Sequence, residues 1–438
     1  MVLDYHILVY NFIIETRKEK LLSISRLMYK KLIFLTMVRL DEISRRGIYT
    51  DLMRKFRSEG HEVYILTPRE RREGEPTSLI EKDGVHILGV KTLNLQKTSI
   101  IEKGVGQILV ESQYKSAIKR YLNDVKFDLI LYSTPPITFP KVIAYLKKRN
   151  PSAITYLLLK DIFPQNAVDL GMMSRTGVKG LLYKFFRNKE RRMYELSDYI
   201  GCMSPANVDF LLKHNPEIDA KRVEVAPNSI DLYLDDNLNG DLGQEKAERY
   251  YIRKKYELPT DKPIFIYGGN LGKPQGIDYL VKCMEANKKR TDCYFVVVGS
   301  GTEYPRLEAW YNANLNLNVK LMKGLPKADY DLLVRSCDVG MIFLDHRFTI
   351  PNYPSRLLSY LEYKMPVVCA TDVNTDIGKI AEENCYGYWC ESVKPEDFTA
   401  LVDKMLASDM KAMGERGYEF LKQNYLVEHT YGAIMKHL

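Results

Sequence analysis

The segment FIYGGNLGKPQGIDYL at residues 265–280 decides the fold of this chain. In it an apolar run meets four glycines and a proline, and an amphipathic pattern follows. A strand, a tight loop and a helix in this order form the unit with which α/β proteins seat a phosphate group. The loop matches neither GxxxxGK[ST] nor GxGxxG, the two common phosphate-binding signatures. We therefore expect a phosphate seat of another kind.

Strand and helix patterns alternate along the rest of the chain. The segments that read as buried strands are 32–36, 62–67, 127–134, 154–161, 198–204, 223–228, 263–269, 293–300, 319–324, 338–344 and 365–371. Such alternation predicts an α/β fold whose parallel sheets are covered by helices on both faces. Residues 232–262 are polar and rich in turn formers, which indicates a linker with a short helix. We predict two doubly wound domains, one on each side of it.

Composition limits the class of protein. The 438 residues are 45% hydrophobic and 27% charged, which is typical of a soluble globular chain with two domains. Seven scattered cysteines without a CxxC motif predict reduced thiols in the cytoplasm and no structural metal. No apolar run reaches the roughly 18 residues of a membrane span. Residues 1–27 look like an extension and a poor signal peptide, so the first domain begins near Met28, which is a second candidate start beside Met1.

The positive charge is concentrated in the first half of the chain. Residues 1–225 hold 38 Lys and Arg against 26 Asp and Glu, whereas the remainder holds 26 against 30. This imbalance indicates an anionic partner, either a membrane surface or a nucleic acid, unless it serves solubility alone. The segment VKGLLYKFFRNKERRMY at 178–194 surrounds an apolar stripe, Leu181, Leu182, Phe185 and Phe186, with basic residues. It fits a helix lying on an anionic leaflet, or a core-packed helix with a solvated face.

The loop of the opening segment supplies the first candidate site residues. Gly269 and Gly272 allow backbone to approach a ligand closely, because glycine has no Cβ. The helix that begins near residue 277 points its free N–H groups and the positive end of its dipole at this loop. Lys273 adds a full positive charge. The alternative is an ordinary turn between a strand and a helix.

Three further loops end strands of the second half. VVVGSGTE contains Gly299, KGLPKADYDLL contains Leu325, and FTIPNYPSRLLSYLEYKMPVV contains Arg356, Ser359 and Glu362. The last three share a helix face that we expect to point toward the strand ends. A cation in a first helical turn, as at Arg356, opposes the helix dipole unless an anion lies between them. A solvent-facing arginine is the alternative.

These segments carry a family resemblance. GNLGKPQGIDYL, VVVGSGTE, KGLPKADYDLLVRSCDVGMI and YPSRLLSYLEYKMPVVCATD resemble the nucleotide-binding domain of GT-B glycosyltransferases. The likeness is to glycosyltransferase family 4, and within it to the bacterial O-antigen and capsule branch that includes L-fucosamine transferases. KDIFPQNAVDLGMM and APNSIDL in the first half resemble later segments of the same family. The likeness covers about residues 28–438, and the order of the motifs is more specific than any single one.

The resemblance implies a GT-B architecture of two Rossmann-like domains. Residues 28–231 would form the acceptor domain, 263–415 the nucleotide-sugar domain, and 416–438 a helix that crosses back to the first domain. The glycine loop would then seat the donor diphosphate. The basic diphosphate residues of the family fall at Asn270 and Gln275 here, so we expect Lys273 and Arg356 to replace their charge. Asn270 and Gln275 remain expected contacts of the sugar-nucleotide donor.

The two family glutamates fall at Pro351 and Ser359, so both carboxylates are missing. A serine makes one hydrogen bond where a carboxylate chelates two ribose hydroxyls. Glu362, one helical turn further, is the candidate substitute. This departure predicts weaker donor binding or a loss of activity.

The resemblance further implies a retaining, metal-independent transferase without a cofactor, using a UDP- or GDP-sugar, an N-acetylated deoxyhexosamine being one candidate. The acceptor would be a lipid-diphosphate-linked saccharide of surface polysaccharide biosynthesis, and nucleic acid is no longer an expected partner. The enzyme would be cytoplasmic and peripheral on the inner face of the plasma membrane. Lys273 and Arg356 would stabilise the leaving diphosphate.

Two residues of the first half are candidates for the same reaction. Asp161, at the end of a strand, would contact the acceptor or donor sugar, and Gly47 would bring backbone near the diphosphate. The alternatives are a helix cap for Asp161 and a helix N-cap for Gly47.

Two other functions remain open at this point. One is a sugar-nucleotide 2-epimerase of the same fold, which needs catalytic carboxylates and a histidine near the anomeric carbon. The other is a non-catalytic subunit that binds a sugar nucleotide or a membrane.

Overall fold

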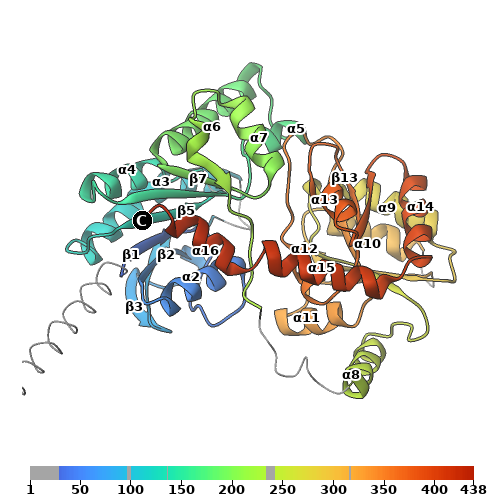
Figure 1. Ribbon diagram of the computed structural model, residues 1–438. Helices are drawn as coiled ribbons and strands as arrows, with labels where there is room; N and C mark the ends of the chain where they lie inside the picture. Colours follow the sequence, from blue (N-terminus) through green and yellow to red (C-terminus); the bar gives the residue numbers. More distant parts are fainter. Residues whose placement is uncertain (1–28, 96–99, 136, 233–241, 315–316) are drawn as a thin grey trace, which may run out of the picture. The chain divides into compact units, whose positions relative to one another are not determined.

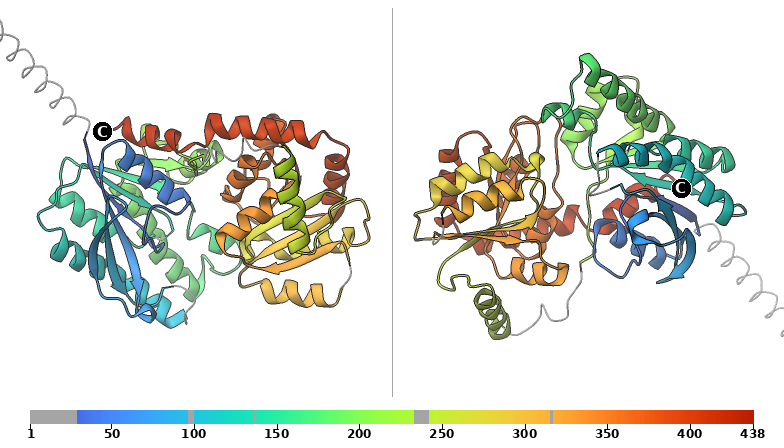
Figure 2. Two further views of the ribbon diagram at one scale, coloured as in Figure 1. Left: turned by 90° about the horizontal axis from the view of Figure 1, so that it is seen from below. Right: turned by 180° about the vertical axis from the view of Figure 1, so that it is seen from behind.

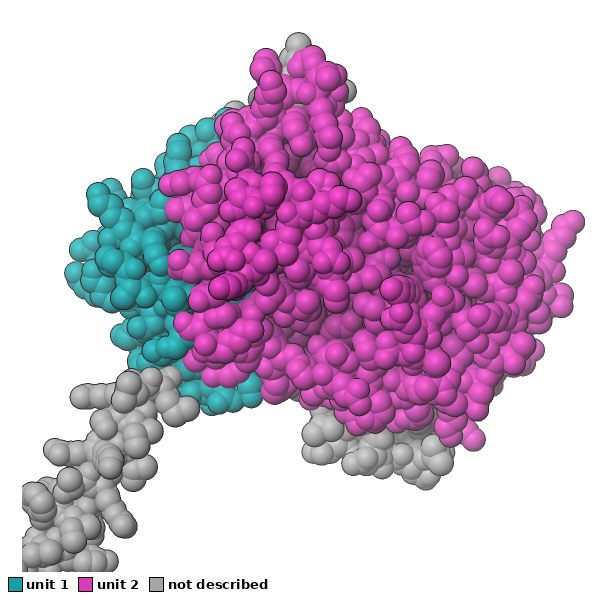
Figure 3. Space-filling model, turned by 45° about the horizontal axis from the view of Figure 1, so that its top comes forward, with its two compact units in different colours: residues 1–132, 138–156, 438 teal, residues 133–137, 157–437 magenta. Residues whose placement is uncertain are grey.

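The computed structural model describes residues 29–95, 100–135, 137–232, 242–314 and 317–438. It forms two compact units, coloured separately in Figure 3. The first unit contains the described residues up to Tyr132, with 138–156 and Leu438, and the second contains 133–137 and 157–437. The predicted N-terminal extension, 1–27, lies outside the described residues. The domain boundaries drawn from the sequence stay predictions.

An eight-stranded sheet is built from the first half of the chain, in the order β3-β4-β2-β1-β5-β6-β7-β8 (Figure 1). Its strands are β1 Lys31–Leu35, β2 Glu62–Glu70, β3 Ser78–Lys82, β4 Val85–Thr92, β5 Leu129–Ser133, β6 Ile154–Leu159, β7 Tyr199–Cys202 and β8 Val223–Val225. β1 pairs in parallel with β2 and β5, and β2 pairs in parallel with β4. Only β3 is seen to run antiparallel among the described pairings of this sheet, on β4.

Helices follow these strands as the sequence predicts. They are α2 Ile48–Ser58, α3 Ile100–Tyr121, α4 Pro140–Arg149, α5 Gln165–Asp169, α6 Gly177–Leu196 and α7 Pro205–His214, with 3-10 turns η1 Arg71–Glu73 and η2 Ala220–Arg222. In α2 the buried face holds Leu52, Met53 and Phe56, the apolar stripe expected from the helical period.

The second sheet is parallel throughout its described pairings and has the order β11-β10-β9-β12-β13-β14. Its strands are β9 Ile264–Asn270, β10 Tyr294–Ser300, β11 Val319–Lys323, β12 Val339–Phe343, β13 Val367–Thr371 and β14 Gly387–Glu391. From β9 the chain adds β10 and β11 on one side of the sheet, and it then returns to add β12, β13 and β14 on the other side of β9. The order of the strands therefore switches between β9 and β12. In open α/β sheets ligands bind beyond the carboxyl ends of the strands at such a switch point.

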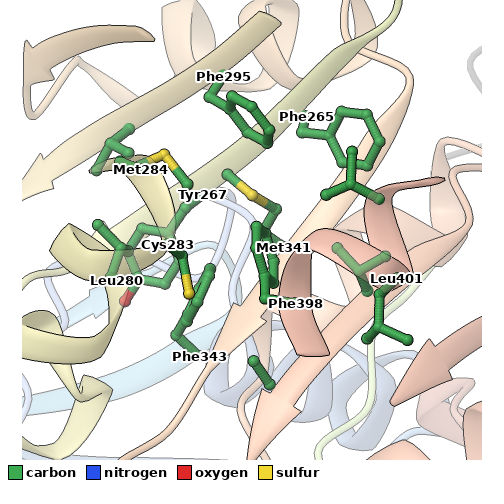
Figure 4. Packing of buried hydrophobic residues seen from close by; sticks show 14 of the residues in the cluster. Phe265, Tyr267, Leu280, Cys283, Met284, Phe295, Met341, Phe343, Phe398 and Leu401 are labelled. Atoms are coloured by element: carbon green, nitrogen blue, oxygen red, sulfur yellow. The ribbon is translucent and has the colours of Figure 1, made fainter. Parts of the chain in front are cut away.

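Helices cover both faces of the second sheet. The helices of the second half of the chain are α8 Leu242–Lys255, α9 Ile277–Asn287, α10 Tyr304–Asn312, α11 Lys327–Arg335, α12 Arg356–Glu362, α13 Ile377–Glu383, α14 Pro395–Leu406, α15 Met410–Asn424 and α16 Val427–Met435, with the 3-10 turn η4 Lys273–Gln275. Of these, α16 lies beside strands of the first sheet. α9 lies beside α14, and α12 lies beside α15 (Figures 1 and 2). Figure 4 shows the core under α9 and α14, where aromatic and sulfur side chains interdigitate.

The C-terminal helix α16 packs against β7 and β8 within the second unit. The Thr430 hydroxyl donates to the carbonyl of Pro227 at 3.0 Å. The ring of His437 stacks on Tyr199 with 3.5 Å between centroids. The end of the chain is therefore held by specific contacts rather than by its connection alone.

The predicted α/β fold with two Rossmann-like sheets is confirmed, and the strands predicted from apolar runs are present. Three strands were not predicted, β3, β4 and β14. β3 is an exposed edge strand that carries charged side chains, so it lacks the buried run of the others. The turn Asp83-Gly84 that joins β3 to β4 has positive φ at both residues, 54° and 72°. An Asp-Gly pair of this kind is a strong hairpin signal, and it was the available clue.

Substitution of Gly299 tests how tightly the carboxyl ends of β9 and β10 pack. A Cβ on Gly299 would lie 1.9 Å from the carbonyl oxygen of Gly269. Gly299→Ala is therefore expected to cost about 1–3 kcal/mol of unfolding free energy, the usual cost of overpacking. Gly432→Ala, in helix α16 with nothing within 4 Å, is the matched control and should be neutral or stabilising by about 1 kcal/mol. Urea denaturation measures both, and equal midpoints for the two variants would contradict the close packing.

Candidate functional site

The loop after β9 is shaped by two glycines that other residues replace only with strain. Gly269 has φ +123° and Gly276 has φ +56°, values that side chains with a Cβ rarely adopt. A Cβ on Gly276 would also lie 3.2 Å from the Cα of Asp345. The Asp345 amide donates to the Pro274 carbonyl at 3.0 Å. The loop after β9 is thus packed against the loop after β12, at the switch point of the sheet.

Asn270 and Gln275 stabilise this loop from within. The Nδ2 of Asn270 donates to the Oε1 of Gln275 at 3.0 Å, and the Gly272 amide donates to the same oxygen at 3.2 Å. The Tyr267 hydroxyl donates to the Asn270 carbonyl at 2.8 Å. The two predicted donor-binding side chains therefore bond to each other, and Gly272 is held in the same small network.

The loop after β10 is fixed to the same backbone. The Leu271 amide donates to the Ser300 carbonyl at 2.9 Å, and the Glu303 amide donates to the Leu271 carbonyl at 2.9 Å. Gly299 and Gly301 leave room for this approach, since a Cβ on Gly301 would lie 2.3 Å from the Leu271 carbonyl oxygen. The strand ends of β9 and β10 therefore present a rigid, mostly backbone surface.

Arg356 reaches the end of β9 from the first residue of α12. Its guanidinium lies 4.2 Å from the ring centroid of Tyr267. A Cβ on Gly269 would lie 3.7 Å from its Nη2. The Nη1 of Arg356 is buried and has no hydrogen-bond partner. No carboxylate of the described residues pairs with this arginine. A buried donor without a partner is expected where a ligand supplies the acceptor.

Tyrosine hydroxyls surround this cation. Burial raises the pKa values of Tyr267, Tyr330 and Tyr360, that of Tyr330 to about 12, so all three are neutral near pH 7. Burial lowers the pKa of Arg356, but the tyrosine hydroxyls outweigh this and raise it overall. The Tyr360 hydroxyl is itself held by the carbonyl of Ile266, to which it donates at 3.2 Å. The cage therefore orients the positive charge of Arg356 without neutralising it.

Lys273 lies at the same end of β9. It is the exposed first residue of η4, three positions after the last residue of the strand. Its side chain has no ion pair with a residue in the described ranges. Lys273 and Arg356, the two predicted diphosphate cations, therefore belong to segments that lie at the end of β9. Their joint contact with a diphosphate stays a prediction.

The remaining predicted donor-binding residues of the second unit are Ser359, Leu325 and Glu362. Ser359 is partly exposed in α12, and Leu325 is partly exposed in the loop after β11. Glu362 is buried in the last turn of α12. Six residues of helix separate it from Arg356 by about 9 Å along the axis. Glu362 therefore lies at the opposite end of α12 from Arg356. Its predicted role as a substitute ribose ligand stays a prediction.

Asp161 follows β6 and is held by its neighbours. The Asn166 side chain donates to both carboxylate oxygens, at 3.0 and 2.9 Å. Burial raises the pKa of Asp161 to about 6. α5 has no side-chain cap, so the alternative of a helix cap for Asp161 is not observed. Its predicted contact with a sugar stays a prediction.

Lys160, next to Asp161, was not singled out from the sequence. Its ammonium donates to the Ala226 carbonyl at 3.0 Å, and burial lowers its pKa to about 7. This lysine ties the end of β6 to the segment after β8.

Gly47, in the first unit, is the N-cap residue of α2. Its carbonyl accepts the amide of Asp51 at 2.8 Å and the hydroxyl of Thr50 at 2.9 Å, while its amide donates to the Asp51 carboxylate at 2.9 Å. The N-cap alternative is therefore realised, and a role near a diphosphate stays a prediction.

The tyrosine cage was missed by reasoning from sequence. Tyr267 stands directly before the glycine pair at 268–269, and this was the one local signal for it. Tyr330 and Tyr360 come from α11 and α12, so only the folded chain brings them to β9. Gly268 accommodates this arrangement, because a Cβ there would lie 2.1 Å from the Tyr330 hydroxyl.

Comparisons with known protein families agree with this architecture. The model described as Glycosyl transferases group 1 matches residues 248–420, and the model described as Glycosyltransferase Family 4 matches residues 48–234. Together they span most of the chain and correspond to its two halves.

The similar proteins that carry a name share a low sequence identity with this chain. "Probable glycosyltransferase WbjE" of Pseudomonas aeruginosa is 20% identical over 75% of this chain and 78% of its own length. "Putative colanic acid biosynthesis glycosyl transferase WcaI" of Escherichia coli K12 is 26% identical over 34% of this chain and 36% of its own length.

Solved structures show the same fold. Sucrose-phosphate synthase from Thermosynechococcus elongatus matches with a TM-score of 0.70 at 15% identity, covering 93% of this chain and 98% of that one. Alr3699/HepE of Anabaena in complex with UDP and glucose matches with a TM-score of 0.63 at 12% identity, covering 93% and 99%. No helix in the described part of the chain has both the length and the hydrophobicity of a membrane span.

The unpaired state of Arg356 has a measurable consequence for stability. Arg356→Met removes a charge without leaving a carboxylate unpaired, so the unfolding free energy should change by only about 1 kcal/mol, the scale of a cation–π contact. Arg253, 4% exposed and bound to Asp338 at 2.6 Å, is the matched control. Arg253→Met should cost about 3 kcal/mol or more, because it breaks a buried ion pair. Equal losses in urea denaturation would show that Arg356 is a structural residue.

Proposed function

We propose that this protein, a GT-B glycosyltransferase of the group 1 and family 4 type, transfers a sugar from a nucleotide diphosphate donor to a lipid-linked saccharide with retention of anomeric configuration. The observation that carries the proposal is the unpaired cation of Arg356 at the switch point of the second sheet. The donor diphosphate is the anion that completes it. The UDP complexes of the structural neighbour HepE support a nucleotide-sugar donor.

The proposed mechanism depends on stabilising the negative charge that develops on the leaving group. The bond between the anomeric carbon and the diphosphate oxygen breaks, and negative charge grows on the departing phosphate. Arg356, Lys273 and the free amides at the start of α9 are placed to stabilise that charge. The acceptor hydroxyl forms the new glycosidic bond on the same face and passes its proton to the departing phosphate. No metal ion is required in this scheme, which stays part of the proposal.

A place in surface polysaccharide biosynthesis is the biological part of the proposal. WcaI is named for colanic acid biosynthesis, and the branch that the sequence resembles makes O-antigen and capsule. Donor sugars of the N-acetylated deoxyhexosamine class are the first to test. Loss of the two family glutamates at Pro351 and Ser359 should weaken the grip on the ribose, so low affinity for the free nucleotide is expected.

Contact with a membrane surface is proposed through α6. Leu181, Leu182 and Phe185 are 69%, 49% and 47% exposed on this helix. Lys184 and Arg191 are exposed beside them. Phe186 departs from the predicted stripe, because its ring packs on Phe163 with 5.1 Å between centroids. Apolar side chains flanked by cations suit an anionic leaflet, and this would bring the enzyme to a lipid-linked acceptor at the inner face of the plasma membrane.

Product analysis tests the transferase. The protein is incubated with a panel of UDP- and GDP-sugars, with and without an undecaprenyl-diphosphate saccharide. We expect nucleotide release and a new α- or β-linkage matching the donor only when acceptor is present. An epimerised free donor would indicate the 2-epimerase, and donor binding without turnover would indicate a non-catalytic subunit.

Arg356→Met should lower kcat/KM by roughly a hundredfold, about 3 kcal/mol of transition-state stabilisation. Arg290→Met is the matched control, since Arg290 pairs with Asp292 and Asp403 at the amino end of β10. Its variant should keep the activity of the parent. Equal activity of both variants would remove Arg356 from the reaction.

Membrane binding is tested by substituting the exposed face of α6. Leu181→Ser with Phe185→Ser removes two large apolar side chains, each worth about 1.5–3 kcal/mol when buried in lipid. We expect co-sedimentation with phosphatidylglycerol vesicles to fall at least to about a tenth. Tyr250→Ser with Tyr251→Ser on α8, at 55% and 66% exposure, is the control and should bind as the parent does. A similar fall in both would refute a role specific to α6.

A further inference from the structure

A groove in the first unit lies outside the candidate site. It has a volume of about 640 Å³ and runs between the start of β3, the end of β4 and the second half of α3. Its lining residues are Pro76, Thr77, Lys91, Ser112, Gln113, Ser116, Ala117, Arg120 and Tyr121. The volume is in the range typical of small-molecule sites. None of these residues takes part in the donor site described above.

The groove carries positive charge without a counter-ion. Lys91 and Arg120 are both exposed, and the lining contains no Asp or Glu. Neither side chain forms an ion pair with a residue that the structure describes. The guanidinium of Arg120 lies 5.5 Å from the ring centroid of Tyr121. Two free cations at one groove favour an anionic occupant.

One residue of the lining holds an acceptor that lacks a donor. The Oε1 of Gln113 is buried and has no hydrogen-bond partner. A buried polar atom left unsatisfied costs free energy, so a ligand that donates a hydrogen bond there would be favoured. The hydroxyls of Ser112 and Ser116 are one turn apart on the same helix and line the same groove. A phosphate group alone has no proton to give Gln113 near neutral pH once it is fully ionised, but a sugar hydroxyl has.

The walls are fixed, which makes the groove a formed feature of the fold. The Tyr121 hydroxyl donates to the Thr77 carbonyl at 2.8 Å and ties the end of α3 to the start of β3. The Lys91 amide donates to the Thr77 hydroxyl at 2.9 Å. Lys91 on β4 and Arg120 on α3 therefore belong to elements that are joined through Thr77.

We propose that this groove binds an acidic saccharide, whose hydroxyl donates to Gln113 and whose carboxylate or phosphate meets Lys91 and Arg120. The inference rests on the proposed function in one respect, that the acceptor or product is a glycan. The groove would hold part of that glycan away from the reacting end. Seven of its nine lining residues carry a polar side-chain group, which suits the hydroxyls of a saccharide.

The test is a binding measurement that needs no turnover. Titration calorimetry of the full chain with trigalacturonic acid, compared with neutral maltotriose, is expected to show binding of the acidic trisaccharide only, weakened by added salt. Lys91→Ala with Arg120→Ala should reduce the affinity by about tenfold or more. Lys119→Ala is the matched control, since Lys119 is an exposed cation of α3 outside the lining, and it should bind as the parent does.

Gln113→Leu supplies a second readout. It should weaken trigalacturonate binding while leaving the thermal unfolding midpoint unchanged or raised, because an unsatisfied acceptor has been removed. Equal binding of the acidic and neutral trisaccharides overturns the proposal. So does parent-like binding by the double variant, or tighter binding to phosphatidylglycerol vesicles or to a DNA oligonucleotide. Arg356→Met should bind trigalacturonate normally, so loss of transferase activity and loss of this site are distinguishable.

Discussion

A positive charge held without a counter-ion is the constraint on which the second half of this protein depends. Arg356 has a buried nitrogen with no partner, and neutral tyrosine hydroxyls surround its guanidinium. A buried polar nitrogen without a partner is costly, so an acceptor supplied by a ligand is expected to complete this arrangement. By contrast, the buried Arg253 is bound to Asp338 and to the carbonyl of Ser336. The two arginines differ in pairing, since Arg253 is bound within the fold whereas Arg356 has a nitrogen that the proposed donor would satisfy.

The glycines at the strand ends allow close packing beside that charge. The backbones of β9 and β10 approach so closely that a Cβ on Gly299 would collide with the Gly269 carbonyl. The loops after β9 and β12 are joined through Pro274 and Asp345. Donors fixed in this way need no reorganisation when charge develops on a substrate, which is the physical basis of electrostatic catalysis. The same packing leaves little freedom to change these residues without loss of stability.

The departures from the family pattern have a local explanation. Where the resemblance places basic residues, this chain has Asn270 and Gln275, and their side chains bond to each other and to the Gly272 amide. They stabilise the loop instead of supplying charge. The positive charge is carried by Lys273 on the loop and by Arg356 from α12. One strand end can thus keep its electrostatic character although the individual positions differ.

The sequence by itself determined the fold class and predicted where a phosphate would be seated. Apolar runs, helical stripes and glycine clusters report local preferences, and these sufficed for the parallel strands other than β4 and β14, for helix α2 and for the loop at 268–276. The exposed hairpin strand β3 was missed because its residues carry charge instead of an apolar run. The roles of Lys273 and Arg356 were inferred partly from the helix dipole and partly from the family resemblance.

Only the tertiary structure decided what surrounds these residues. Tyr330 and Tyr360 reach Tyr267 from α11 and α12, and Glu362 is buried toward the far end of its helix. The cations Lys91 and Arg120, 29 positions apart in the sequence, line one groove together with Gln113, whose Oε1 has no hydrogen-bond partner. The physical reason is the same in each case. Burial, pairing and charge compensation depend on neighbours distant in the chain, and no local pattern records which neighbours folding will supply.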